Sequence, residues 1–273
     1  MTPELKLILA RAPAWSKVTG GGTELGVRAQ VQRASGQVDA AVSLRVWSAN
    51  GKIHVKEEPP LQWPGGCPER HINADGSFCL GIGDPLWPQS ADDADHWWSW
   101  LHQFIVSQRV ADRTGRWPSS RALHHGSAAT YQLELERLSS GTHFEEEVHA
   151  SLEGERTWLS RDLPRLFKDG RRLVNLRSPC PRGCHRRGKP ILRRNCGSKD
   201  LVLKLIRAER MRRTEEARFW EGWKGRSCCQ TMVSCPLRAQ AQPLFGPKAR
   251  MCSRSLLHAG AIRAAASEPF SKR

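Results

Sequence analysis

The sequence predicts an α+β fold: a short N-terminal helix, an antiparallel β-meander, a loop that carries candidate chemistry, and C-terminal helices. Three observations support this prediction. Apolar and polar residues alternate in three successive runs between residues 25 and 55. Turn-forming residues separate these runs. Beyond residue 92 the apolar spacing changes to that of amphipathic helices, which places the main helices after the sheet.

The first helix is expected to begin after Thr2, a suitable N-cap, with Pro3 at the first helical position. Ser35-Gly36 separates the first two alternating runs, and Asn50-Gly51 separates the second from the third. Asn-Gly is a strong hairpin signal because both residues tolerate positive φ. The runs comprise Leu25, Val27, Ala29 and Val31, then Val42, Leu44 and Val46, and finally Ile53 and Val55.

Two helices are predicted after the loop. The first spans about residues 92–111, with Asp92 or Asp93 as its cap, and ends before the sequence Gly-Arg-Trp-Pro at 115–118. Trp97 lies at helical spacing from Leu101 and Phe104, which favours a core position over a surface binding stripe. The second helix is expected over residues 127–139.

Charge and composition divide the chain. Its formal net charge is +16, but residues 1–150 carry about −3 and residues 151–273 about +19, so the second half alone is basic. We expect a site-bearing domain over 1–140, a mostly helical connection over 141–175, a small helical cysteine-rich unit over 176–237 and a disordered basic tail over 238–273. The chain shows no membrane span or secretion signal, which predicts a cytoplasmic protein that contacts no membrane.

The segment Cys-Pro-Glu-Arg-His-Ile-Asn-Ala-Asp-Gly-Ser-Phe-Cys-Leu-Gly at 67–81 carries the candidate chemistry. Cys79 follows His71 and Asn73 in a polar loop, and a reachable thiolate is a nucleophile for acyl transfer. An asparagine amide can donate to the oxyanion that develops during attack on an acyl carbon. Taken alone, the spacing is equally consistent with a buried cysteine that has no catalytic role. Cys67 is expected to be buried, the alternative being a disulfide with Cys79.

The wider pattern resembles the ubiquitin-conjugating enzyme family. His71 and Asn73, followed by Gly76, Cys79 and Leu80, match that family's His-Pro-Asn and Gly-x-Ile-Cys-Leu motifs, placed after a meander and before a Trp-containing helix. Trp-Pro at 117–118 and His-Gly at 125–126 resemble features of the bacterial members. The resemblance covers about residues 1–140. Ile72 replaces the motif's proline, and Asn73 precedes Cys79 by only six positions.

The resemblance implies a ubiquitin-conjugating-like fold and a transferase that needs no cofactor for catalysis. Cys79 would accept the C-terminal glycine of a ubiquitin-like modifier from an activating enzyme and pass it to an amine. Asn73 would hold the oxyanion and His71 would shape the loop, while Asp75 and Asp84 either assist deprotonation or are merely solvated. The implied partners are the activating enzyme, the modifier and a deconjugating peptidase, in systems associated with phage defence.

Six cysteines cluster in the second half, where four thiolates could bind a structural zinc ion. The alternative is a set of plain reduced thiols. The expected zinc set is Cys180, Cys184 and Cys196 with one of the three later cysteines, and His185 is a substitute ligand. The whole pattern resembles a bacterial group with a cysteine-rich region after the conjugating domain. The six residues are Cys180, Cys184, Cys196, Cys228, Cys229 and Cys235.

A basic amphipathic helix is predicted from Leu201 to about Trp220, either as a solvated helix or as a contact for nucleic acid or an acidic partner. The contact would use Arg207, Arg210, Arg212 and Arg213. This gives a second hypothesis, a catalytically silent scaffold with a zinc-stabilised basic module. A third is a thiol hydrolase that pairs Cys79 with His124 or His125.

Overall fold

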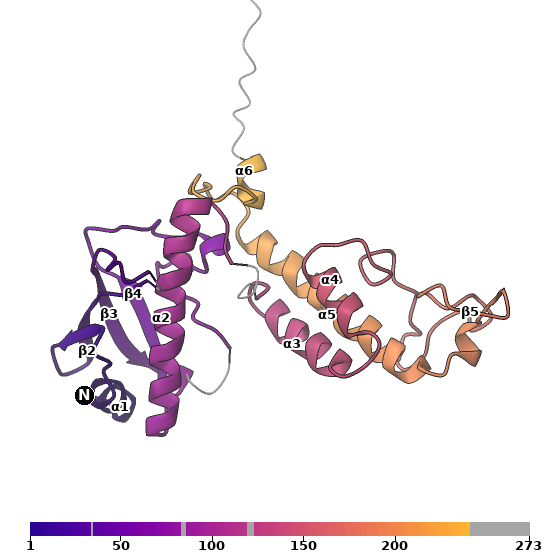
Figure 1. The fold of residues 1–273 in the computed structure, drawn as a ribbon, viewed down its shortest axis with the longest axis horizontal. Coiled ribbons are helices and arrows are strands. Elements are labelled where there is room, and N and C mark those ends of the chain that lie inside the picture. Colours follow the sequence, from indigo (N-terminus) through magenta and orange to yellow (C-terminus); the bar gives the residue numbers. More distant parts are fainter. Residues whose placement is uncertain (34, 83–85, 119–122, 241–273) are drawn as a thin grey trace, which may run out of the picture. The chain divides into compact units, whose positions relative to one another are not determined.

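The N-terminal helix forms where the sequence predicts it. The computed structural model describes residues 1–33, 35–82, 86–118 and 123–240. Helix α1 spans Pro3–Ala10, and the Thr2 hydroxyl accepts a hydrogen bond from the Leu5 amide at 3.4 Å. Leu5 and Ile8 are fully buried, and the Trp98 indole of helix α2 (Ala91–Thr114) donates to the Ile8 carbonyl at 2.9 Å, which ties α1 to α2 (Figure 1).

Four antiparallel strands form the meander in sequential order: β1 (Ser16–Thr19), β2 (Glu24–Ala29), β3 (Val42–Ala49) and β4 (Lys52–Glu57). The alternating runs correspond to β2, β3 and β4, whereas β1 is too short and polar to be recognised from its sequence. Asn50 and Gly51 both have positive φ and form the tight turn between β3 and β4. Cross-strand register keeps the alternating apolar residues in one core.

Helix α2 packs its apolar face into the same core as the strands, with Trp97 and Leu101 fully buried. Its N-cap is Ser90 rather than Asp92 or Asp93. The Ser90 hydroxyl accepts from the Asp93 amide at 3.2 Å while the Asp93 carboxylate accepts from the Ser90 amide at 3.0 Å, so Asp93 completes a capping box. The helix ends at Gly115 in the left-handed region, as the sequence predicts.

A second core forms around helix α5 (Lys199–Gly222), which packs against α3 (Ala128–Ser139) (Figure 1). Helix α3, placed with residues 1–140 in the sequence analysis, therefore shares a core with the cysteine-rich segment. This core includes Leu135, Phe144, Leu159, Val202, Leu205 and Ile206.

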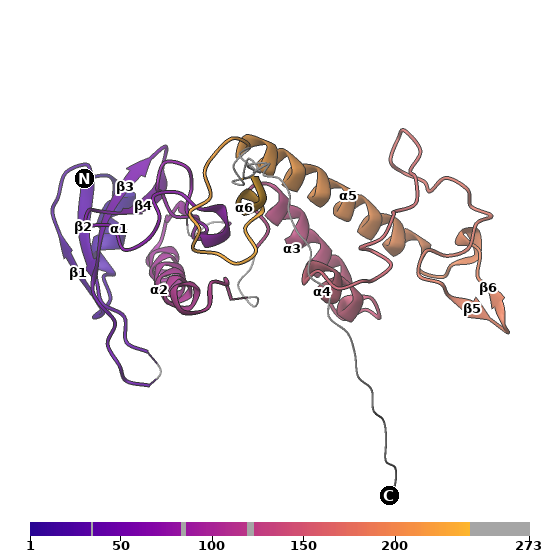
Figure 2. The same cartoon turned by 90° about the horizontal axis from the view of Figure 1, so that it is seen from above.

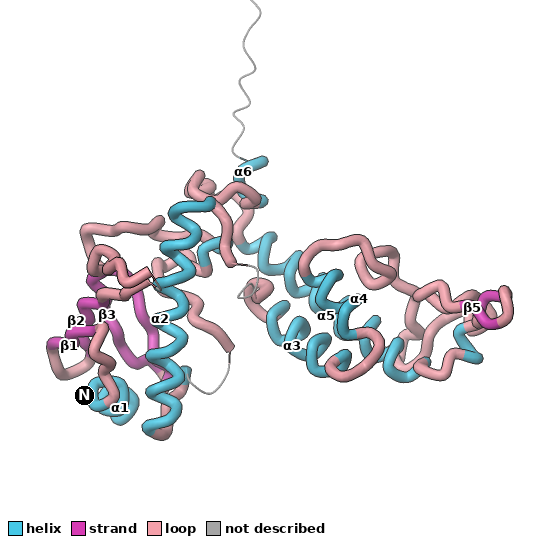
Figure 3. Tube along the Cα trace, in the orientation of Figure 1, coloured by secondary structure: helices cyan, strands magenta, loops and turns pink. Residues whose placement is uncertain are grey.

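The prediction of a mostly helical connection over 141–175 is wrong. Only α4 (Glu145–Leu152) is helical there, and Figure 3 shows the remainder as loop. Gly154, Pro164 and Gly170 interrupt this stretch at short intervals, which prevents a second helix from propagating. Leu166 and Leu173 form an isolated antiparallel bridge instead.

Three of the four arginines in the predicted contact run, Arg210, Arg212 and Arg213, are bonded to other groups of the protein. Glu209, 1% exposed, accepts two bonds from Arg212 at 2.7 and 2.8 Å and one from Arg213 at 2.6 Å. Arg210 donates to the backbone carbonyls of Leu163 and Pro164. Of the four residues in the predicted run, only Arg207 is exposed.

The rest of the cysteine-rich segment contains little regular structure. Strands β5 (His185–Arg186) and β6 (Lys189–Pro190) form a small hairpin, and short helix α6 covers Pro236–Gln240 (Figure 2). The predicted disordered tail, 238–273, lies outside the described residues apart from its first three positions. None of the helices in the described ranges combines the length and apolar character that a membrane span requires.

Candidate active site

Backbone hydrogen bonds hold the Cys79 loop in place. After β4 the chain passes through a short 3₁₀ helix, Pro68–Arg70, and folds back so that Ile72 bridges both Cys67 and Phe78. The Phe78 amide donates to the Val55 carbonyl of β4 at 2.8 Å, and the Cys79 amide donates to the His71 carbonyl at 2.7 Å. Cys79 is therefore presented from a backbone anchored to the sheet.

The Cys79 side chain is exposed and lines a pocket of about 480 Å³. Protein packed around the sulfur removes enough hydration to raise the pKa of the Cys79 thiol, while the Lys52 charge and a hydrogen bond from the Gly81 backbone oppose that rise. The pocket thus combines an open path to the thiol with a cation that favours its thiolate. Its walls are Lys52, Ile53, His54, Asn73, Ala74, Asp75, Ser77, Phe78, Leu80, Gly81 and Leu86.

Lys52 is a site residue that the sequence analysis missed. It lies 27 positions before Cys79 at the start of β4, and an isolated bridge between Lys56 and Ser77 aligns that strand with the segment leading to Cys79. Its ammonium group also lies 5.3 Å from the centre of the Trp87 ring. No local sequence signal marks Lys52, because this pairing depends on how the loop docks on the sheet.

Replacement of Lys52 by glutamine is expected to raise the pKa of Cys79 further and slow its alkylation about threefold at pH 8, because a charge that favours the thiolate is lost. Lys52→Arg should keep the wild-type profile. The pH dependence of Cys79 alkylation, followed by peptide mass spectrometry, measures the effect. Lys56→Gln on the same strand is the matched control, and identical profiles for both glutamine variants would refute the role of Lys52.

Asn73 lines the Cys79 pocket, but its side chain is held back in the turn before Cys79. Its amide donates to the Ser77 hydroxyl at 3.0 Å, and Asp75 accepts from the Ser77 hydroxyl at 2.6 Å and from the Ser77 amide at 2.9 Å. The bonds from Ser77 lower the pKa of Asp75 despite partial burial, so this carboxylate is ionised at neutral pH. Asp84 lies outside the described residues.

His71 occupies the left-handed region with φ of 53°. Its ring lies 4.8 Å from the Trp117 ring and 5.4 Å from the His125 ring. Burial, with a smaller contribution from His125, lowers the pKa of His71 to about 3, so the imidazole is neutral near pH 7. His71 contacts Cys79 through its backbone carbonyl, which accepts a hydrogen bond from the Cys79 amide.

Neither of the other two candidate histidines lines the Cys79 pocket. His124 contacts the Glu216 carboxylate of α5 at 3.1 Å. His125 stacks on Phe219 of α5 with ring centres 4.8 Å apart, and its Nε2 lies 3.7 Å from a carboxylate oxygen of Glu69. Both side chains join α5 to the first half of the chain, an arrangement that gives no support to a cysteine–histidine dyad.

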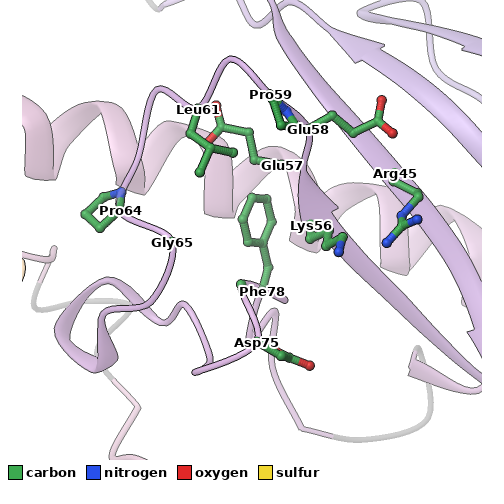
Figure 4. Close-up of a pocket in the computed structure, with 11 residues that line it drawn as sticks. Arg45, Lys56, Glu57, Glu58, Pro59, Leu61, Pro64, Gly65, Asp75 and Phe78 are labelled. Atoms are coloured by element: carbon green, nitrogen blue, oxygen red, sulfur yellow. The ribbon is translucent and has the colours of Figure 1, made fainter. Parts of the chain in front are cut away.

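A second pocket of about 370 Å³ shares Asp75 and Phe78 with the first. Figure 4 shows the Phe78 ring directed toward Glu57, with Lys56 and Arg45 on the neighbouring strands. The Glu57 carboxylate accepts the backbone amides of Gln62 and Trp63 at 2.7 and 3.1 Å, and burial raises its pKa. These bonds give Glu57 a structural role in holding the start of the loop.

The cysteines form two groups at opposite ends of α5. Cys184 and Cys196 each contact Cys180 before the helix, and Cys235 contacts Cys228 after it. Since α5 has 24 residues at about 1.5 Å rise each, the groups are separated by roughly 36 Å of helix. The predicted set of Cys180, Cys184 and Cys196 with one later cysteine is therefore not assembled. Within the described ranges, no three Cys, His, Asp or Glu side chains are placed to hold a metal ion.

Cys67, buried as expected, belongs to the second group. Its sulfur lies 3.1 Å from that of Cys229, across 162 residues of sequence. The Cys67 contact, together with bonds from Thr231 and the charge of Arg70, lowers the pKa of Cys229 to about 5, although partial burial opposes this. Nothing in the local sequence of Cys67 indicates this pairing.

The order of elements and the cysteine loop define the ubiquitin-conjugating, or E2, class of fold. A family model described as the prokaryotic E2 domain matches residues 16–119, and one described as a cysteine-rich domain C-terminal to the E2 domain matches residues 124–237. The chain belongs to the prokaryotic E2 proteins that carry this cysteine-rich domain. No curated protein and no solved structure matches it.

Proposed function

We propose that this protein is a conjugating enzyme that carries a ubiquitin-like modifier as a thioester on Cys79 and passes it to an amine. The observation that supports the proposal is the exposed Cys79 thiol in a pocket, on a loop hydrogen-bonded to the sheet of an E2 fold. The modifier and an activating enzyme are the partners that this reaction requires. A conjugating transferase role at this general level is what the E2 family match supports.

The carrier reaction consists of two acyl transfers. The Cys79 thiolate attacks the carbonyl carbon of the modifier's C-terminal thioester, and the activating enzyme's thiolate leaves. An amine then attacks the new thioester, Cys79 leaves as thiolate, and the amine loses its proton to solvent or to Asp75, which lines the same pocket. To donate to the oxyanion, the Asn73 amide must exchange its bond to Ser77 for one to the reacting carbonyl.

The test is a loading assay with ATP, a candidate activating enzyme and its modifier, read by intact mass and non-reducing gels. Wild type should form a thiol-sensitive adduct, Cys79→Ser a thiol-resistant oxyester, and Cys79→Ala none. Cys184→Ala, which removes another partly exposed thiol, is the control and should load normally. An adduct that persists in Cys79→Ala, or its absence from wild type whose Cys79 alkylates readily, would count against the proposal.

The second candidate function is binding of nucleic acid, now through the β5–β6 hairpin. Arg186, Arg187 and Lys189 are exposed there, and no ion pair joins them to an acidic residue in the described part of the chain. Clustered cations without acidic neighbours attract phosphate backbones. This observation favours the hairpin over α5 as the contact.

Replacement of Arg186, Arg187 and Lys189 together by alanine is expected to weaken binding to a labelled 20-base-pair DNA by about tenfold or more. Loss of up to three phosphate contacts should also reduce the magnitude of the slope of log K against log salt concentration by about two to three. Fluorescence anisotropy across a salt series measures both. Arg218→Ala, on exposed α5 surface, is the control, and a triple variant that binds like wild type would exclude the hairpin.

A further inference from the structure

Cys67 and Cys229 are two thiols in direct contact although they lie far apart in the sequence. Their sulfurs are 3.1 Å apart, and Cys67 is 2% exposed whereas Cys229 is partly exposed. The two residues come from separate family domains, Cys67 from the E2 domain and Cys229 from the cysteine-rich domain. A bond between them would join the two domains covalently.

Backbone hydrogen bonds hold Cys67 in the Cys79 loop. Its amide donates to the Ile72 carbonyl at 2.9 Å, and the Ile72 amide donates back to the Cys67 carbonyl at 3.0 Å. His71 and Asn73, the candidate site residues, flank Ile72 directly. Cys67 is therefore bonded to the centre of the loop that positions Cys79.

The Cys229 sulfur is held by a second set of contacts. It lies 3.1 Å from the Thr231 hydroxyl, which accepts a hydrogen bond from Arg70 Nε at 2.8 Å. Arg70 itself is 2% exposed and bonds to Asp112 and Gln108 of α2, so its guanidinium is fixed. This chain of contacts keeps Cys229 beside Cys67 and places a cation near its sulfur.

We propose that Cys67 and Cys229 are a peroxide-reactive thiol pair whose disulfide joins the Cys79 loop to the cysteine-rich domain. Cys229, the more accessible sulfur, would attack hydrogen peroxide: its S–O bond forms, the O–O bond breaks and hydroxide leaves. Cys67 then attacks the Cys229 sulfur, forming the S–S bond and releasing hydroxide, which takes the Cys67 proton to give water. In sum, two thiols and one peroxide yield one disulfide and two waters.

The two remaining thiols nearby, Cys228 and Cys235, are both buried and contact each other. They are thus less accessible to an oxidant than Cys229.

The pairing of Cys67 with Cys229 is independent of the proposed conjugating function, since disulfide formation requires neither a modifier nor an activating enzyme.

The experiment treats the reduced full chain, exchanged into EDTA, with stoichiometric hydrogen peroxide. The products are blocked with N-ethylmaleimide and mapped as peptides without reduction. Wild type should yield a linked pair of peptides containing Cys67 and Cys229, lost on later reduction. Cys228→Ser, the matched neighbour, should still give this link, whereas Cys229→Ser should abolish it.

Three results would overturn the proposal. One is that N-ethylmaleimide still modifies both Cys67 and Cys229 after peroxide treatment of wild type. Another is that Cys67 links instead to Cys228, Cys235 or Cys79. The third is that protein never exposed to EDTA contains one zinc per chain that is lost equally in Cys67→Ser and Cys229→Ser, which would make the thiols metal ligands.

Discussion

Replacement of Arg70 by alanine is expected to lower the free energy of unfolding by about 2–3 kcal/mol, because the change removes the hydrogen bonds that a buried guanidinium makes to the fully buried Gln108 and to the partly exposed Asp112. Arg70 is 2% exposed and joins its loop to α2, through Asp112 at 2.7 Å and Gln108 at 3.1 Å, and to the cysteine-rich domain, through Thr231 at 2.8 Å. Urea denaturation measures the loss. Since Arg70 lies between Cys67 and His71, loading of Cys79 should fall as well.

Arg11→Ala provides the matched control for Arg70. Arg11 also forms an ion pair, with Asp95, but both side chains of this pair are more than 40% exposed, so its removal should leave the urea midpoint nearly unchanged. Arg70→Lys should recover part of the loss, because it keeps the charge but not the planar set of donors. Equal unfolding energies for Arg70→Ala and Arg11→Ala would contradict the assigned role of Arg70.

Replacement of Glu209 by alanine is expected to destabilise the second core by about 3–5 kcal/mol. The change leaves the largely buried Arg212 with Glu216 as its one carboxylate partner among the described residues, and it removes the carboxylate that Arg213 shares. The Arg212 guanidinium stays charged in the folded protein, so its lost partner cannot be compensated by deprotonation. Thermal and urea unfolding, with α-helical circular dichroism as the signal, report the effect.

Glu221→Ala is the control on the same helix, with the same residue type and the same three-residue spacing to its partner. The Glu221–Lys224 pair is about 70% exposed on both sides, so its loss should change stability by less than about 1 kcal/mol. The two substitutions differ in burial and in the partners lost, two arginines for Glu209 and one lysine for Glu221. A Glu209→Ala protein as stable as Glu221→Ala would show that the charge network of α5 contributes little.

Much of the fold could be predicted because it rests on interactions between residues close in sequence. Thr2 caps α1, Asn50-Gly51 closes the β3–β4 hairpin, and Gly115 ends α2, each through local backbone geometry. The Ser90 cap is local as well, because Ser-x-x-Asp at 90–93 has the spacing of a capping box. The spacing of Glu209, Arg212 and Arg213 likewise places these three charges on one face of α5, so their pairing is a local interaction.

In the candidate site, too, some features follow from local sequence and others from contacts between distant segments. The sequence by itself determined the meander, the loop with Cys79 and the helices that flank it, because hydrophobic period, caps and motif spacing are local properties. Only the tertiary structure decided that Lys52 lies near Cys79, that α3 packs on α5, and that Cys67 meets Cys229. These contacts depend on the register and docking of segments far apart in the chain, and residue type alone does not specify which distant side chains converge.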